Sequence, residues 1–195
     1  MTSPPTSGSR DTDAGRPLRI LYGFSHYPDP ADQGKVMAGL MQRLRVAGLR
    51  IDPFCLTLDP PSSCLAWREL DARWKRGDPA LLRMYERLAI ALTDYDVFVN
   101  GAGINLHPEM VSQLPVPSIY ACFDDPESSE ILSRPVAAAY DLALVGNIAE
   151  LQRYRSWGCP RVEHWPLGFK AGDADPTLTE QDILEGHRDV AISML

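Results

Sequence analysis

Two strand-like runs in the C-terminal half of the chain end in polar residues, and this pattern constrains the fold more than any other feature. Residues 117–123 lead into Asp124-Asp125-Pro126, residues 141–147 lead into a capped helix, and a third run follows at residues 161–169. Strands that alternate with helices over short connections pack as a parallel sheet. Ligands of open parallel sheets bind at the carboxyl ends of the strands, so the residues there are the first candidates for function.

The same alternation begins near Leu18. Residues 18–24 and 51–58 have the composition of strands, and apolar residues at helical spacing predict a helix over residues 33–47 between them. Pro53 weakens the second run, because proline suits the start of a strand or an edge strand better than a paired centre.

The middle of the chain continues the pattern. Asp78 followed by Pro79 predicts the start of a helix, since aspartate is a good N-cap and proline fits the first helical position. A short buried strand follows at residues 96–100, and a short helix or turn at residues 107–114. We therefore predict an α/β fold class, with a doubly wound, mainly parallel Rossmann-like sheet and helices on both faces.

The helix after residue 147 has a clear beginning and end. Asn147 and Glu150 have the spacing of a capping box, and Gly158 supplies the stop. Its predicted buried stripe consists of Ile148, Leu151 and Tyr154.

The pattern divides the chain into four parts. Residues 1–16 are rich in polar residues and predict a disordered tail, and residues 17–170 form the Rossmann-like domain. Residues 171–187 are linker-like. Residues 188–195 read as a strand, which we interpret as the first strand of a second domain that this chain does not contain.

Composition excludes several classes of protein. A net charge of -7 argues against a partner held through nucleic-acid phosphates. No run is long and apolar enough to span a membrane, and the N-terminus lacks the pattern of a signal peptide. The four cysteines lack the spacing of a zinc site and predict free thiols rather than disulfides. The interpretation is a reduced, cytoplasmic protein with no metal.

The order of these motifs resembles a known family. The loop Asp32-Gln33-Gly34-Lys35, the strand ending in Asp-Asp-Pro, the unit YDLALVGN with ELQRYRSWG, and the run RVEHWPLGF are together similar to the N-terminal Rossmann-like domain of GT-B glycosyltransferases. The likeness is nearest to the CgeB-like spore-maturation branch of the group 1 transferases. Trp165-Pro166-Leu167-Gly168 and Asp189-Val190 stand where those enzymes carry a proline-leucine-glycine segment and the first strand of the second domain.

The resemblance implies transfer of a sugar from a nucleotide-sugar donor to a hydroxyl acceptor, with this domain on the acceptor side and no further cofactor. The donor domain is absent from the chain. Because transfer needs donor and acceptor in one cleft, we expect this chain to be inactive without that domain.

The predicted catalytic residues are Asp124, Asp125 and His26. The two carboxylates follow a strand, where one would accept a hydrogen bond from a sugar hydroxyl or act as a general base. The alternative interpretation of Asp124 is a helix N-cap. His26 lies in the first loop after a strand, and histidine suits proton transfer near neutral pH, although an ordinary loop histidine fits equally well.

The predicted substrate-binding residues are Gly34, Lys35, Gly101 and Asn147. Gly34 and Lys35 begin the first predicted helix, where free backbone N–H groups bind anions, although a flexible turn with a solvated lysine fits as well. Gly101 and Asn147 lie where predicted strands end.

Aromatic and histidine residues elsewhere receive no role in the predicted site. Trp67 and Trp74 are seven positions apart, as on one helix face, and we interpret them as packing residues rather than a stacking surface for a ligand. His107, His164 and His187 have no partner at a meaningful spacing.

Two rival functions remain open. Gly101-Ala102-Gly103 follows a strand and Asp124 comes about twenty residues later, which is the spacing of an NAD-binding fingerprint. Leu106 replaces the third glycine, however, and the motif follows the third strand instead of the first. The other rival is a stand-alone module that binds a ligand or serves as a scaffold without chemistry.

Overall fold

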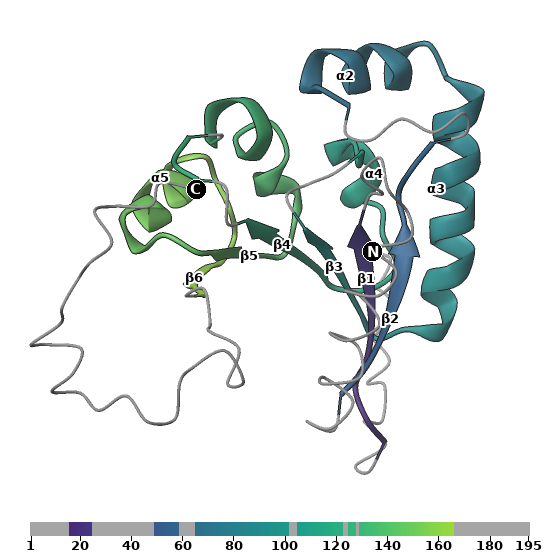
Figure 1. Cartoon of the computed structure of the whole chain (residues 1–195), viewed down its shortest axis with the longest axis horizontal. Coiled ribbons are helices and arrows are strands. Elements are labelled where there is room, and N and C mark those ends of the chain that lie inside the picture. The colour runs from purple at the N-terminus through teal and green to yellow at the C-terminus, as the bar shows by residue number, and fades with distance from the viewer. Residues whose placement is uncertain are drawn as a thin grey trace, which may run out of the picture. The chain divides into compact units, whose positions relative to one another are not determined.

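The computed structural model describes residues 16–24, 49–58, 65–101, 105–122, 125–127 and 129–165. They form one open, six-stranded, all-parallel sheet with the strand order β2-β1-β3-β4-β5-β6 (Figure 1). This confirms the predicted α/β class. The strands are β1 (Arg19–Phe24), β2 (Arg50–Cys55), β3 (Val97–Gly101), β4 (Ser118–Cys122), β5 (Leu142–Val145) and β6 (Val162–His164).

Helices fill the connections between β2 and β6. They are α2 (Trp67–Lys75), α3 (Pro79–Ala91), α4 (Pro108–Val111) and α5 (Leu151–Ser156). Shorter helical turns occur at Leu92–Asp94, Ser129–Ser133, Ala137–Ala139 and Ile148–Glu150.

The strand order places a topological switch point between β1 and β3. The chain moves from β1 to β2 in one direction and from β3 to β6 in the other, so β1 has its neighbours on opposite sides. Crevices at the carboxyl ends of strands open at such points.

Most buried side chains of the described strands lie on one face of the sheet. Right-handed connections that advance in one direction along a parallel sheet all lie on the same face, and by this rule the connections from β2 through to β6 do so. The buried side chains of this face include Leu21, Phe98, Ser118, Tyr120, Cys122, Ala143, Val145 and Val162. On the opposite face, Ile51 and Ala121 are buried, whereas Val99 and Leu144 are half-buried.

Local sequence signals set the ends of α3 and α2. Asp78 caps α3 by accepting hydrogen bonds from the N–H groups of Ala80 and Leu81, as the sequence predicted. Gly77 ends α2 with φ +67°, a conformation that glycine adopts without steric cost. The N–H groups of Gly77 and Asp78 bond to the carbonyls of Trp74 and Arg73, the pattern of a Schellman motif.

The strand that contains Pro53 lies at the edge of the sheet, as expected of a strand with an internal proline. The prediction for Ile148 was wrong. Its side chain is 67% exposed, because residues 148–150 form a 3-10 turn before α5 and the 3.6-residue periodicity does not extend through it. The stretch that carries Trp67 and Trp74 forms α2.

Several predictions lie outside the described residues. These are the N-terminal tail, the helix at 33–47, the linker at 171–187 and the strand at 188–195. In the described part of the chain, no helix is long and apolar enough to cross a membrane. Cys55, Cys122 and Cys159 are free thiols, and burial raises the pKa of Cys159 to about 11.

Gly23 tests the packing of β1 against the core. A Cβ atom there would lie 2.8 Å from Cδ1 of Leu56 and 3.0 Å from Cζ of Phe98. We expect Gly23→Ala to lower the free energy of unfolding by about 1 to 3 kcal/mol, measured by urea denaturation. Adding Leu56→Val should recover part of the loss, so the double variant should cost less than the sum of the singles.

Gly77→Ala is the matched control. Apart from its chain neighbours, no atom in the described part of the chain lies within 4 Å of its added Cβ. Its cost of about 1 kcal/mol should therefore come from the positive φ alone and should not respond to Leu56→Val. A Gly23→Ala variant as stable as the parent would contradict the described packing.

Candidate functional site

Four buried tyrosine hydroxyls lie near the carboxyl ends of β3 and β4, and each has a hydrogen-bond partner. The side chains of Tyr85, Tyr120, Tyr140 and Tyr154 are at most 3% exposed. A buried hydroxyl without a partner is costly, so each of these residues fixes the group to which it bonds. We refer to the four as the tyrosine layer.

Burial is the main cause of the shifted pKa values in this layer. It raises the pKa of all four hydroxyls well above the ordinary tyrosine value. For Tyr154, the Cys122 thiol and the Asp125 carboxylate add to that shift. The tyrosine layer therefore stays neutral and acts through hydrogen bonding.

Asp125 is the carboxylate that this layer holds. It is 7% exposed and lies three residues after the end of β4. The hydroxyl of Tyr154 on α5 donates to its Oδ2, and Oγ of Ser133 lies 3.0 Å from Oδ2 and 3.2 Å from Oδ1. Tyr120 in turn donates to Oγ of Ser133 at 2.8 Å. A buried carboxylate with several donors is fixed in position.

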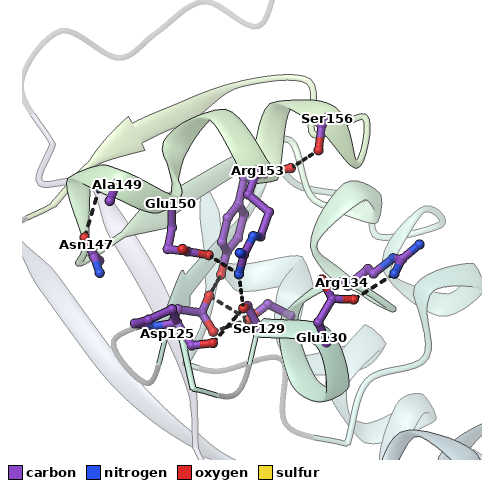
Figure 2. A network of polar contacts seen from close by, with 12 residues as sticks. Asp125, Ser129, Glu130, Arg134, Asn147, Ala149, Glu150, Arg153 and Ser156 are labelled. Carbon is purple, nitrogen blue, oxygen red and sulfur yellow. Dashed lines mark hydrogen bonds and ion pairs between the residues drawn. The ribbon is translucent and has the colours of Figure 1, made fainter.

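A second set of contacts holds the same loop from α5 (Figure 2). Arg153 donates from Nη1 to Oγ of Ser129 at 2.9 Å, and Ser129 donates to the carbonyl of Pro126 at 2.8 Å. Nη1 of Arg153 also lies 3.0 Å from Oε2 of Glu150, whose side chain is only 8% exposed. Two consecutive residues of α5 thus hold the loop that follows β4.

Asn100 and Gly101 form the corresponding end of β3. Nδ2 of Asn100 donates to the hydroxyl of Tyr140 at 2.7 Å. Oδ1 of Asn100 is buried and has no hydrogen-bond partner within the described ranges. Gly101 packs closely against β1, because an added Cβ would lie 2.9 Å from the hydroxyl of Tyr22.

The turn after β3 is held by Tyr85 of α3. The Tyr85 hydroxyl accepts from the N–H of His107 at 2.8 Å and donates to the carbonyl of Asn105 at 3.0 Å. Asn105 has φ 53°, and its side chain donates to the Leu56 carbonyl at 2.9 Å. His107, to which we assigned no role from its sequence context, caps α4 by accepting the N–H of Glu109 at Nδ1.

Asn147 lies after β5, on the same edge of the sheet as Gly101 and Asp125. Its Oδ1 accepts the N–H of Ala149 at 3.0 Å and caps the turn before α5. The capping box is half formed, because the side chain of Glu150 pairs with Arg153 instead of reaching back to the Asn147 N–H. The predicted role of Asn147 in binding stays a prediction.

The other predicted site residues cannot be placed against these. His26, Gly34, Lys35 and Asp124 lie outside the described residues. Of the predicted set, the structure places Gly101, Asp125 and Asn147 at the carboxyl ends of three adjacent strands, β3, β4 and β5.

The tyrosine layer is the feature that sequence reasoning missed. Tyr154 was assigned to an apolar helix stripe, which is where it lies, but a buried tyrosine also needs a polar partner. That requirement is the signal in the sequence that could have revealed the tyrosine layer. It predicts a hydrogen bond but does not identify the partner residue.

The arrangement brings two buried acceptor groups to the carboxyl edge of an open sheet. They are the Asp125 carboxylate, held by Tyr154 and Ser133, and Oδ1 of Asn100. Among the residues that the structure describes, no group of three or more His, Cys, Asp or Glu side chains is placed to hold a metal ion.

Comparison with known proteins adds no identification. No protein-family model matches the chain. No curated protein matches it either.

The bond between Asp125 and Tyr154 can be tested by a double-mutant cycle. We expect Asp125→Asn and Tyr154→Phe each to lower the free energy of unfolding by about 1.5 to 3 kcal/mol, because each removes a buried hydrogen bond to a charged group. The double variant should cost less than the sum by about 1 kcal/mol or more, measured by urea denaturation.

Glu163→Gln is the control, since Glu163 forms an exposed ion pair with Arg161 and its loss should cost less than about 0.5 kcal/mol. Strictly additive effects of Asp125→Asn and Tyr154→Phe would show that the two side chains do not interact.

Proposed function

We propose that this chain is the acceptor-side domain of a glycosyltransferase that uses a nucleotide-sugar donor. The observation that carries the proposal is the buried Asp125 carboxylate, held by Tyr154 and Ser133 at the carboxyl end of β4. The motifs that resemble GT-B enzymes support it independently.

We assign different roles to the two adjacent carboxylates, Asp124 and Asp125. Both oxygens of Asp125 accept hydrogen bonds from within the protein, so Asp125 acts as a positioning residue. Asp124, the preceding residue, is the proposed general base. It would accept the proton of the acceptor hydroxyl while that oxygen bonds to the anomeric carbon and the bond from this carbon to the nucleotide phosphate breaks.

A binding module without chemistry is the second candidate. One observation favours it: both oxygens of Asp125 accept hydrogen bonds from inside the protein, as those of a purely structural carboxylate would. Such a module would bind a hydroxyl-bearing ligand at the same edge and would not transfer it.

The described turn after β3 counts against dinucleotide binding. A pyrophosphate is normally held at the N-terminus of a helix that begins within the glycine motif. Here α4 begins only at Pro108 and has four residues, and Leu106, in place of the third glycine, is 0% exposed.

Backbone amide NMR during ligand titration tests the proposal. The probes are UDP-glucose, GDP-mannose, a panel of mono- and disaccharides, and NAD. We expect a sugar or nucleotide sugar to shift the amide signals of Gly101, Asp125 and Asn147, while Val97 at the opposite end of β3 stays unchanged. Shifts with NAD alone would favour the dinucleotide rival, and a carboxyl edge that responds to no probe would contradict the proposal.

Asp124→Asn then tests the assigned roles. We expect it to weaken binding of the responding sugar by about tenfold or more, which corresponds to about 1.4 kcal/mol. Glu127→Gln is the matched control, because Glu127 is an exposed carboxylate in the same loop. Equal effects of the two substitutions would remove Asp124 from the site.

A further inference from the structure

We propose that α2 is a lid over the carboxyl edge, locked by the insertion of His107 between two tryptophans. The ring of His107 stacks on Trp67 with a centroid distance of 5.4 Å and on Trp74 with 5.0 Å, at interplanar angles of 18° and 16°. Seven residues of helix rise about 10.5 Å, which matches the two stacking distances taken together. The imidazole therefore lies between the two indole rings.

We call the site on α2 that receives the His107 ring the socket, and Asp71 is its third residue. It lies between Trp67 and Trp74 on α2, and its Oδ1 is 3.5 Å from Nε2 of His107. Trp74 also donates from Nε1 to Oε2 of Glu109 at 2.9 Å. Lys75 pairs with Asp71 at 2.7 Å on the outer side.

The position of α2 links the His107 stacking to ligand access at the carboxyl edge of the sheet. His107 belongs to the turn after β3, which borders the switch point between β1 and β3. Figure 1 shows α2 beyond the tips of β1 and β2, at the end of the sheet to which these strands point. The Leu65 N–H, two residues before α2, bonds to Oδ1 of Asn105 in the same turn at 2.8 Å.

Two features limit the strength of the lock. Of the nine residues of α2, Leu70 is the one that is fully buried, while Trp67 and Trp74 are only partly buried against the core. Nε2 of His107 is buried and has no hydrogen bond of good geometry within the described residues, because Oδ1 of Asp71 lies at the long distance of 3.5 Å. Water would satisfy this nitrogen when α2 opens, which offsets part of the lost stacking.

Gly77 provides the hinge. It joins α2 to α3 with φ +67°, and apart from its chain neighbours no atom of the described residues lies within 4 Å of the position of its missing Cβ. Opening at Gly77 leaves α3 in place, together with the bond between Tyr85 and the His107 N–H. The claim that α2 controls ligand access rests on the proposed function. The claim that α2 opens does not depend on that function.

Native-state amide hydrogen exchange of the ligand-free chain tests the opening. We expect the amides of α2 to exchange at least tenfold faster than Met84 and Leu88 of α3, while the His107 amide keeps the protection of α3. His107→Asn retains a good N-cap but removes the stack, so it should speed exchange in α2 a further tenfold without affecting α3.

A gain-of-lock variant sharpens the test. Asp71→Glu extends the carboxylate by one methylene towards Nε2 of His107 and should slow exchange in α2 severalfold. Glu69→Gln is the control, because Glu69 is an exposed residue of α2 paired with Arg73 outside the socket, and it should change exchange less than twofold.

The proposal is overturned if α2, the His107 amide and α3 exchange together as one unit, or if Asp71→Glu leaves α2 unchanged. Should His107→Asn not fold, Trp67→Phe, which keeps an aromatic ring of smaller area, must still speed exchange in α2 relative to α3. Failure of the sugar titration would leave these exchange rates unaffected, so the two proposals fail separately.

Discussion

The need to satisfy four buried tyrosine hydroxyls organises the carboxyl edge of this sheet. Each hydroxyl ties a segment of that edge to the core: Tyr85 holds the turn after β3, Tyr140 holds Asn100, and Tyr120 and Tyr154 hold Asp125 through Ser133 or directly. An apolar core would fix the strands without fixing these polar ends. The tyrosine layer therefore turns the end of a stable sheet into a set of positioned polar groups.

The two halves of the edge are held in different ways. On the β4 side, α5 is tied to the loop by two directional hydrogen bonds, from Tyr154 to the buried Asp125 carboxylate and from Arg153 to Ser129. On the β3 side, α2 is held by the stacking of His107 between two indoles, by the buried Leu70 and by the hydrogen bond from Trp74 to Glu109. In the lid that we propose, the β4 side is the fixed part of the edge and α2 is the part that moves.

The sequence predicted what depends on local patterns. The order of strands and helices, the Asp78 cap and the stop at Gly158 follow from residues close together in the chain. Ile148 was misplaced because helical periodicity was extended over a 3-10 turn. Trp67 and Trp74 were correctly interpreted as packing residues.

The partners of these local elements could not be predicted, because they are distant in sequence. Tyr154 and Asp125 are separated by 29 positions, and Asn100 and Tyr140 by 40. Nothing in the pattern around Trp67 and Trp74 indicates that His107 fills the space between them. Asp125 lies just after a strand, as the sequence predicted, but a single sequence does not show that both its oxygens are engaged by Ser133 and Tyr154.

Spectrophotometric titration of tyrosine ionisation tests the central claim most directly. A hydroxyl whose pKa is raised by folding keeps its proton when the unfolded chain would lose it, so the stability it contributes is present below about pH 10 and is lost as the pH rises further. Of the seven tyrosines in the chain, we expect the four of the layer to ionise only together with alkaline unfolding, in one cooperative step. Reversible ionisation of all seven near pH 10 in the folded chain would contradict the account.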